Sequence, residues 1–513
     1  MNQRPFIRKI IYLAILVLLL IPLSLLSMPS RPPTPAEPGR PGEAGSKGGK
    51  LAQLRDEYKL GQANLGQIDP TSEAIKLATL GMRGFAATIM WNKANTYKMK
   101  EDWTGLSAAL EQIIKLQPNF VTVWQFQGWN LAYNISYEFD DYRERYFWVI
   151  KGVRFLQEGM KYNETAPKLV EYVGWVISQK IGIADEKVQF RRLFREDNDF
   201  HGSRPIAERD NWLVGRQYYL EAEQMARNED MLDKLNPLVF LFHAPKALIN
   251  YAIALEEDGV FEERATVAWN TALNEWQKFG QVDIRTTEDR AMRLNDFGRV
   301  SDQIDELVKQ LDALPPAGRR ELIYEEKLAA LPQDERDALK RPAEQRSSDE
   351  HRLAASAQQK AEVTSGELAE RVDPQQREAA RELAKQIDDL KLTLHHIDRG
   401  REVLNYPYWL TRCEMECRPE TIEARRLMYQ ADKALADNDL NAALDLYEQG
   451  FAKWDEALKD FPTMRKDNLF GDDLAPFIKR YRVLLKERDA SFPDDFPLSD
   501  ILGAQREKGN INE

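Results

Sequence analysis

The sequence predicts an all-α fold: a superhelical solenoid of paired helices with an inserted coiled-coil hairpin and one amino-terminal transmembrane helix. Three observations carry this prediction. Residues 91–118 and 124–167 each contain two amphipathic stretches closed by a proline, which is typical of helical repeats. Two apolar seams, near residues 300 and 390, recur at coiled-coil spacing. An apolar run near the amino terminus is long enough to cross a bilayer.

The amino-terminal run extends from Ile10 to Leu26, 17 residues interrupted only by Pro22 and Ser24. At about 1.5 Å rise per residue it covers roughly the hydrocarbon thickness, and continuation to Met28 makes the span sufficient. Basic residues precede it and indicate that the amino terminus stays inside while the bulk is exported, to a periplasmic or equivalent compartment. Residues 1–28 are therefore expected to be a signal anchor. A cleaved signal peptide is the alternative, although Pro29 and poor cleavage spacing disfavour it.

Residues 29–50 form a linker rich in proline and glycine, a composition that buries too little apolar surface to order itself. The first 50 residues hold seven basic and two acidic side chains, a net charge of +5. Because the whole chain carries −12, the remaining residues carry −17. Such an acidic body argues against nucleic-acid binding, which depends on neutralising phosphates.

Residues 51–294 are expected to be the main repeat region, with a polar lead-in helix, a helix starting at Pro70 and a longer one over 82–100. The helix of the second pair has two apolar faces. Trp124, Gly128 and Leu131 define one, and a second face carries aromatic residues, namely Phe126, Trp129, Tyr133 and Tyr137. A helix that is apolar on two sides is either enclosed between neighbouring helices or lines a groove.

Later segments vary in regularity. A third helix pair begins at Leu169, residues 184–211 read as a loop or short helix inserted between repeats, and helices resume over 212–227, 245–257 and 261–279. Residues 295–400 are charged and helical. Their two apolar seams are expected to pair antiparallel in a hairpin. The first seam is Val300, Ile304, Leu307 and Leu311, and the second is Leu383, Ile387, Leu390, Leu394 and Ile397. Prolines interrupt the helices between the seams, which predicts mobility over 340–375.

Residues 401–490 contain the most regular repeat, followed by a polar tail over 491–513. Small and aromatic residues fall in the order Ala431, Ala434, Asn438-Asp439, Ala443, Tyr447, Gly450, and Phe461-Pro462 ends the pair. This order resembles a tetratricopeptide repeat, tightly here and loosely over 82–280. Over most of its length the chain also resembles uncharacterised membrane-anchored repeat proteins of planctomycete-type bacteria, through Lys115–Phe120, Val123-Trp124 and Trp129-Asn130-Leu131. The resemblance implies a protein-binding scaffold and supplies no reaction.

Motifs that would indicate catalysis, a cofactor or a metal are missing from the sequence. The five histidines have no HExxH or paired CxxC context, and neither a GxxxxGK[ST] loop nor a GxSxG elbow occurs. Cys413 and Cys417, four residues apart, are expected to be free buried thiols or, less readily, a bridge at a frayed helix end. Asp141 is expected to cap the helix that starts near Tyr142.

The best candidates for partner binding are Trp129, Asn130, Tyr133 and Asn134, because aromatic rings interleaved with amides can hold an extended peptide, a polyprenyl chain or a sugar. The alternative is that this aromatic stripe is core. The sequence therefore predicts a non-enzymatic, membrane-anchored scaffold for protein–protein interaction at the cell envelope. The other possibility is an enzyme or lipid-carrier accessory that acts on envelope glycans through an aromatic groove.

Overall fold

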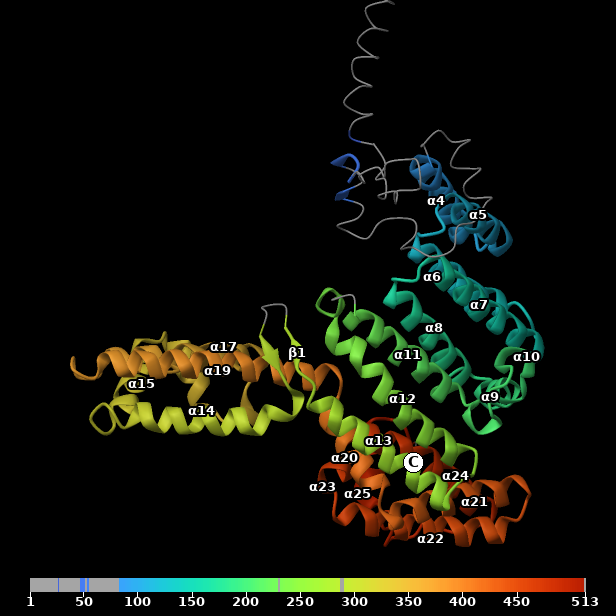
Figure 1. Ribbon diagram of the computed structural model, residues 1–513. Coiled ribbons are helices and arrows are strands. Elements are labelled where there is room, and N and C mark those ends of the chain that lie inside the picture. The colour runs from blue at the N-terminus through green and yellow to red at the C-terminus, as the bar shows by residue number, and fades with distance from the viewer. Residues whose placement is uncertain are drawn as a thin grey trace, which may run out of the picture. The chain divides into compact units, whose positions relative to one another are not determined.

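The computed structural model describes residue 26 and residues 47–50, 53–54, 83–228, 231–286 and 290–511 (Figure 1). The chain divides into two compact units, residues 1–231 and 232–513, so the division falls inside the predicted repeat region 51–294. The described residues are predominantly helical, with one two-stranded antiparallel sheet formed by β1 (Ile284–Arg285) and β2 (Ala291–Met292). The predicted all-α class is confirmed at this level. Outside the described residues lie the predicted anchor apart from residue 26, most of the linker, and nearly all of the predicted lead-in helix and the helix starting at Pro70.

Unit 1 is a series of helices in which each element from α4 to α9 packs against the next along the chain, and α11 packs closely against α8. Its elements are α4 (Arg83–Met99), α5 (Trp103–Leu116), α6 (Val121–Trp129), the π-helix η2 (Asn130–Ile135), α7 (Tyr142–Tyr162), α8 (Pro167–Gly182), α9 (Lys187–Glu196), α10 (Asn198–His201), the 3₁₀ turn η3 (Ile206–Glu208) and α11 (Asn211–Asn228). One core joins α4, α5 and α6, and a second joins α6 to α11. Asp141 caps α7, its carboxylate accepting from the Arg143 backbone N–H at 2.7 Å, as predicted.

Two sequence expectations for unit 1 need correction. The helix that carries Trp124 is not uniform, because it changes from α to π geometry at Asn130. Residues 184–211 are neither a loop nor a single short helix. They form α9, α10 and η3, and Phe190 and Phe194 are fully buried in the second core. Because aromatic side chains bury large apolar areas, these two phenylalanines fix the segment to the helices beside it.

Unit 2 begins with a 3₁₀ turn and continues through fourteen helices and the small sheet. Its helical elements are η4 (Leu232–Lys234), α12 (Pro237–Glu257), α13 (Glu262–Gly280), η5 (Leu294–Asp296), α14 (Phe297–Asp312), α15 (Arg319–Ala330), α16 (Gln333–Lys340), η6 (Ala343–Gln345), α17 (Ser348–Ala361), α18 (Ser365–Glu370), α19 (Arg377–Val403), α20 (Tyr406–Glu416), α21 (Pro419–Ala436), α22 (Leu440–Lys459), α23 (Pro462–Arg465), α24 (Asn468–Glu487) and α25 (Ser499–Glu507).

Helix α12 starts two turns before the predicted position, so Pro245 lies inside it. The helix begins where the Asn236 side chain accepts from the Val239 backbone N–H and Pro237 takes a first-turn position. By length and composition, α12 is the one helix among the described residues that is apolar enough to cross a membrane. More than half of its apolar window is buried inside the unit, as expected of a core helix.

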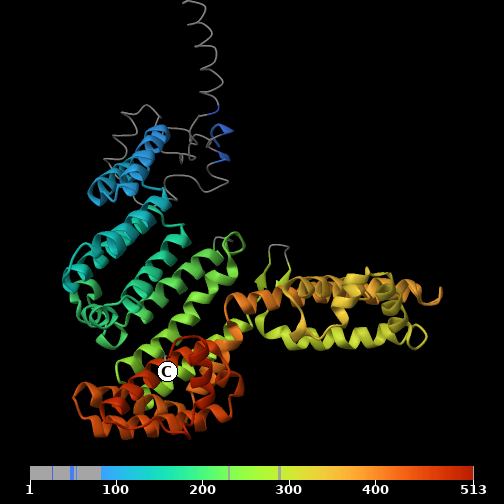
Figure 2. The ribbon, with the colours of Figure 1, turned by 180° about the vertical axis from the view of Figure 1, so that it is seen from behind.

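The two predicted seams pair as expected, since α14 packs along α19 in both views (Figures 1 and 2). The pairing is antiparallel, because Arg401 near the end of α19 donates to the Leu294 carbonyl, just before α14, at 2.7 Å. The chain between the seams, which includes the stretch 340–375 predicted to be mobile, is folded into helices. Helices α15 to α18 pack within the same lobe, and Ser347 and Thr364 each start a helix with a complete capping box. We call residues 297–403 the α14–α19 lobe.

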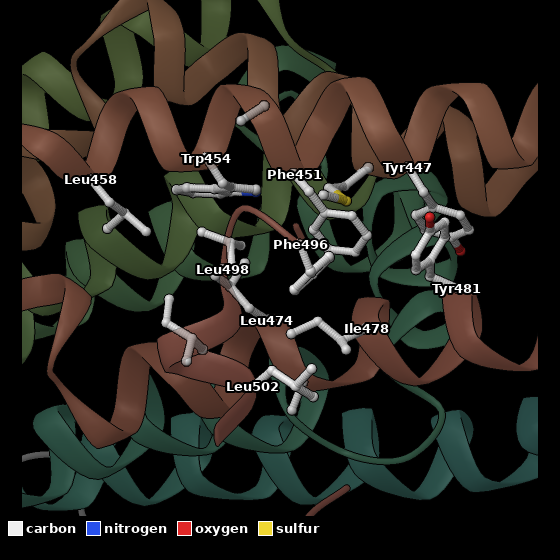
Figure 3. Packing of buried hydrophobic residues seen from close by; sticks show 14 of the residues in the cluster. Tyr447, Phe451, Trp454, Leu458, Leu474, Ile478, Tyr481, Phe496, Leu498 and Leu502 are labelled. Atoms are coloured by element: carbon white, nitrogen blue, oxygen red, sulfur yellow. The ribbon is translucent and has the colours of Figure 1, made fainter. Parts of the chain in front are cut away.

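The carboxyl-terminal part of unit 2 has the largest described core, which lies between α20 and α25. Figure 3 shows side chains of α22 facing those of α24, with Phe496, Leu498 and Leu502 between or beside them. Residues 491–513 are therefore not simply a polar tail. Phe496 packs 5.0 Å from the Phe451 ring, and Ile501 and Ile511 are buried in the same core.

Candidate binding surface

The four predicted binding residues lie at the junction of α6 and η2, but they are not equally accessible. Trp129, Tyr133 and Asn134 are half-buried, whereas Asn130 has no exposed surface. The opposite face behaves as the periodicity predicts, with Trp124 and Leu131 buried. The helix therefore has one face committed to packing and another that keeps part of its aromatic surface in contact with solvent.

The amides form a ladder that links the π-helix to α5. Asn134 Nδ2 donates to Asn130 Oδ1 at 2.9 Å, and Asn130 Nδ2 donates to Gln127 Oε1 at 3.3 Å. Gln127 Nε2 donates in turn to Ser107 Oγ at 2.9 Å. Buried amides need such partners, because an unpaired one would lose the hydrogen bonds that water gave it. Asn130 thus positions its neighbours and is not itself open to a partner.

The half-buried rings around Trp129 form a continuous series across three helices. The ring centroids of Trp129 and Tyr133 are 5.9 Å apart, and those of Tyr133 and Trp175 are also 5.9 Å apart. We call the series the aromatic row; its members, in order of contact, are Trp91 on α4, Phe126 and Trp129 on α6, Tyr133 on η2, and Trp175 and Tyr172 on α8. Every member keeps part of its surface exposed.

Lysines lie over two rings of the aromatic row. Lys98 Nζ is 5.1 Å from the Phe126 centroid, and Lys180 Nζ is 4.9 Å from that of Tyr133. Ammonium groups within about 6 Å of a ring centroid are attracted by the ring face. Burial lowers the pKa of Lys180, while Glu186 opposes that shift. The row therefore combines an apolar surface with local positive charge.

The two tyrosines of the row stay neutral phenols at neutral pH. Burial raises the pKa of Tyr172 to about 12, with a smaller contribution from Glu171. Burial also raises the pKa of Tyr133, and the neighbouring Tyr172 adds to the shift. Neutral phenols retain an O–H that can donate to a carbonyl or hydroxyl of a bound molecule.

A second group of functional-type residues, which the sequence analysis missed, lies buried in unit 2 where α12, α20, α21 and α24 meet. Glu416 is fully buried, and its carboxylate accepts from Arg425 Nη2 at 2.5 Å. Arg412 Nη2 lies 2.6 Å from Asp473 Oδ2. Arg412 Nε also lies 3.6 Å from the Glu416 carboxylate. These ion pairs connect the consecutive helices α20 and α21 to α24, which lies much later in the chain.

Glu256 on α12 completes this ionic cluster. Its carboxylate accepts from Trp269 Nε1 at 2.8 Å and lies 3.8 Å from Arg425 Nε. Burial, followed by repulsion from Glu416, raises the pKa of Glu256 to about 8, although Arg425 opposes the shift. Two carboxylates thus share one guanidinium, and burial beside Glu416 favours the protonated form of Glu256.

Lys246, also on α12, lies beside the ionic cluster with its Nζ 3.6 Å from the Trp409 ring centroid. Burial lowers its pKa to about 7, with a further contribution from Arg412, while Cys413 and Asp473 oppose the shift. Cys413 and Cys417 are free thiols, the first buried and the second half-buried, in agreement with the favoured expectation. Burial raises the pKa of both, so neither is an activated nucleophile.

Sequence signals for this cluster existed but were weak. Arg412 and Glu416 are four residues apart on one helix, where charges of opposite sign usually form an exposed pair. Glu256 lies near the end of a mostly apolar helix, which is a better sign of a buried charge. Within the described ranges, no three His, Cys, Asp or Glu side chains lie close enough to hold a metal ion.

No protein-family model matches the chain, and no characterised protein is significantly similar to it.

Proposed function

We propose that this chain is an exported, membrane-anchored helical-repeat scaffold that holds a protein partner at the cell envelope and performs no catalysis. The amino-terminal apolar run supports the anchor and the export. Consecutive packed helices in unit 1 and the α21–α22 pair support a solenoid of tetratricopeptide-like repeats. Ala431, Ala443 and Tyr447 are fully buried in that pair, as small and aromatic residues are where such helices cross.

The aromatic row is the observation that carries the proposal. It crosses three helices of unit 1, and an extended peptide laid along it would contact one ring after another. Half-exposed aromatic rings supply a large contact area at low conformational cost, because each has few rotatable bonds. Lys98 and Lys180 on the ring faces favour a peptide that carries carboxylates.

The second candidate, an accessory that acts on envelope glycans, is favoured by one feature of the same surface. Tyr133 and Trp175 are stacked with an interplanar angle of 27°, and the half-buried Asn134 follows Tyr133 in the chain. Flat aromatic faces next to a hydrogen-bonding amide also suit a sugar ring. The aromatic row therefore supports two ligand classes, which an adduct formed at the row can distinguish.

Site-specific cross-linking in native membranes tests the proposal. A photoreactive phenylalanine analogue placed at position 129 of the full-length chain should give a discrete, protease-sensitive adduct, which the Trp175→Ala change should abolish. An adduct that resists protease but is cleaved by glycan hydrolases would support the second candidate instead.

The matched control is position 147, because Phe147 is 60% exposed on α7 and does not belong to the aromatic row. The same analogue at this position should give no discrete adduct. Equal adducts at positions 129 and 147, or an adduct at 129 that is insensitive to Trp175→Ala, would contradict a binding role for the row.

A further inference from the structure

Unit 2 has a cleft of about 800 Å³ between the start of α12, the β1–β2 hairpin and the end of α19. Contacts between α12 and β1 and between α19 and β2 hold its walls together. The volume lies within the range of about 300–1,000 Å³ that small-molecule sites occupy. The cleft is separate from the aromatic row and does not depend on the proposed function.

The described lining of the cleft is basic, although the chain as a whole carries −12. Four basic side chains line it, and none of the described lining residues is acidic: the four are Lys234, Arg285, His396 and Arg399. Basic side chains gathered in a concave site attract ions of negative charge. Its chemistry therefore favours an anionic group.

The arrangement of α19 explains why its acidic residues do not line the cleft. Four lining residues share one face of α19, because three of them follow the first by three, four and seven residues: His396, Arg399, Gly400 and Val403. Asp398 and Glu402 belong to other faces of the same helix. Arg399 pairs with Glu402 at 3.1 Å, but both side chains are more than half exposed. Such an exposed pair contributes little stability and would yield to a better anionic partner.

The floor of the cleft is apolar. Ile284 and Met292 are cross-strand partners in the small sheet and are both buried. Leu238 and Val403 add further apolar surface from α12 and α19. Gly400 also lines the cleft, and an added Cβ there would be 3.2 Å from Leu294 Cδ2, 3.4 Å from Met292 Cε and 3.6 Å from Leu238 Cδ2. These neighbours are all apolar, which agrees with an apolar floor.

We infer that this cleft binds an anionic amphiphile, a molecule with a carboxylate or phosphate head and a single aliphatic chain. The head group contacts the basic side chains, and the chain lies on the apolar floor. Basic groups alone would suit any small anion, and an apolar floor alone would suit any hydrocarbon, so the combination selects the amphiphile.

Calorimetric titration of the full-length protein in an uncharged detergent tests this inference. Decanoate and decyl phosphate serve as probes, and decyltrimethylammonium controls for the alkyl chain with the opposite charge. We expect one anionic probe or both to bind at one site, and the cationic probe to bind at least about tenfold more weakly. A preference between decanoate and decyl phosphate identifies the head group.

Single changes assign the binding to the cleft. Arg399→Glu and Arg285→Glu should each weaken the anionic probe by about tenfold, because each loses a charge-assisted contact and adds repulsion. Arg352→Glu is the matched control, since Arg352 is 80% exposed on α17 and does not line the cleft. Val403→Ser should weaken decyl phosphate but leave inorganic phosphate unchanged.

Three results would overturn the inference. One is equal affinity for the anionic and cationic probes. Another is unchanged affinity in both arginine variants while their circular dichroism remains that of the wild type. The third is inorganic phosphate binding as tightly as decyl phosphate, since the apolar floor would then contribute nothing.

Discussion

Individual residues at the α6–η2 junction show how burial separates a binding role from a positioning role. Trp129 and Asn130 are adjacent in sequence, yet the indole keeps exposed surface and the amide has none. The Asn130 amide instead connects Asn134 to Gln127. Loss of Asn130 would therefore act on a partner indirectly, through the position of its neighbours, whereas loss of Trp129 would remove contact area.

The same ladder includes Ser107 on α5. In the structure Ser107 Oγ accepts from Gln127 at 2.9 Å, and Asn130 Nδ2 lies 3.4 Å away. Ser107→Ala would leave part of a buried amide without a partner, at a cost of about 1–3 kcal/mol. It is unsuitable as a control for packing changes in unit 1.

The buried carboxyl of Glu256 predicts a pH dependence of stability. Its pKa is raised from 4.5 to about 8 in the fold, so between these values the folded chain binds more protons than the unfolded chain. Stability therefore falls as the pH rises through this window and is level above it. Glu256→Gln removes this contribution. We expect the melting temperature of the variant, relative to wild type, to be higher at about pH 8.5 than at about pH 5.

The expected size is substantial, because each unit of pKa difference corresponds to about 1.4 kcal/mol. Glu326→Gln is the control, since Glu326 is 60% exposed and makes only a surface pair with Arg371. Its melting temperature relative to wild type should not change with pH. If Glu256→Gln behaved in the same way, the buried carboxyl would not carry the extra proton.

At the scale of elements, glycines decide how closely two helices of unit 1 approach. An added Cβ at Gly128 would collide with the Leu156 side chain, which supports the expectation that Gly128 lies on a packing face. An added Cβ at Gly152 would lie 2.7 Å from the Gly128 carbonyl oxygen, which belongs to the backbone and cannot turn aside. The α6–α7 crossing thus depends on small residues in both helices.

Gly152→Ala should destabilise unit 1 by about 1–3 kcal/mol, because the two helices must separate to admit a methyl group. Gly84→Ala is the matched control in the same unit, since its added Cβ would meet only Gln117 Nε2 at an ordinary 3.6 Å. That change should be neutral or stabilise by up to about 1 kcal/mol through helix propensity. Equal chemical denaturation midpoints for the two variants would contradict a tight crossing.

The α14–α19 lobe offers a second test at this scale. Leu307, a member of the predicted seam, is only half-buried, whereas Leu311 is fully buried. Leu311→Asp should therefore increase hydrogen exchange throughout the α14–α19 lobe, while Leu307→Asp should have a smaller effect there. A buried unpaired carboxylate is costly, but a half-buried one can reach water. Equal exchange in both variants would mean that the seam is not the stabilising contact.

For the whole molecule, periodicity predicted what depends on local sequence and missed what depends on distant contacts. Apolar residues at steps of three and four predicted the helices, the packing face of Trp124 and the α14–α19 pairing. The ionic cluster does not, because Glu256 and Arg425 are separated by much of unit 2 before the fold brings them together. Phe496 was likewise read as part of a polar tail, since a few apolar residues among many polar ones give no period. Periodicity also did not predict the π-helix that begins at Asn130, because a π-helix has more residues per turn than an α-helix and so shifts the face on which later residues lie.

The proposed role of the chain at the envelope depends on its amino terminus, which leads to the last prediction. The apolar run from Ile10 to Leu26 lacks small residues at the usual cleavage spacing, and Pro29 follows almost at once. We therefore expect residues 10–28 to remain in the mature protein and to hold it in the membrane, because about 19 apolar residues suffice to span the hydrocarbon. Amino-terminal sequencing of protein taken from native membranes decides between anchor and signal peptide. Resistance to alkaline carbonate extraction serves as the second measurement. A mature chain that begins near residue 29 and is extracted by carbonate would make the protein a soluble exported one, and its partner would then have to be sought away from the membrane.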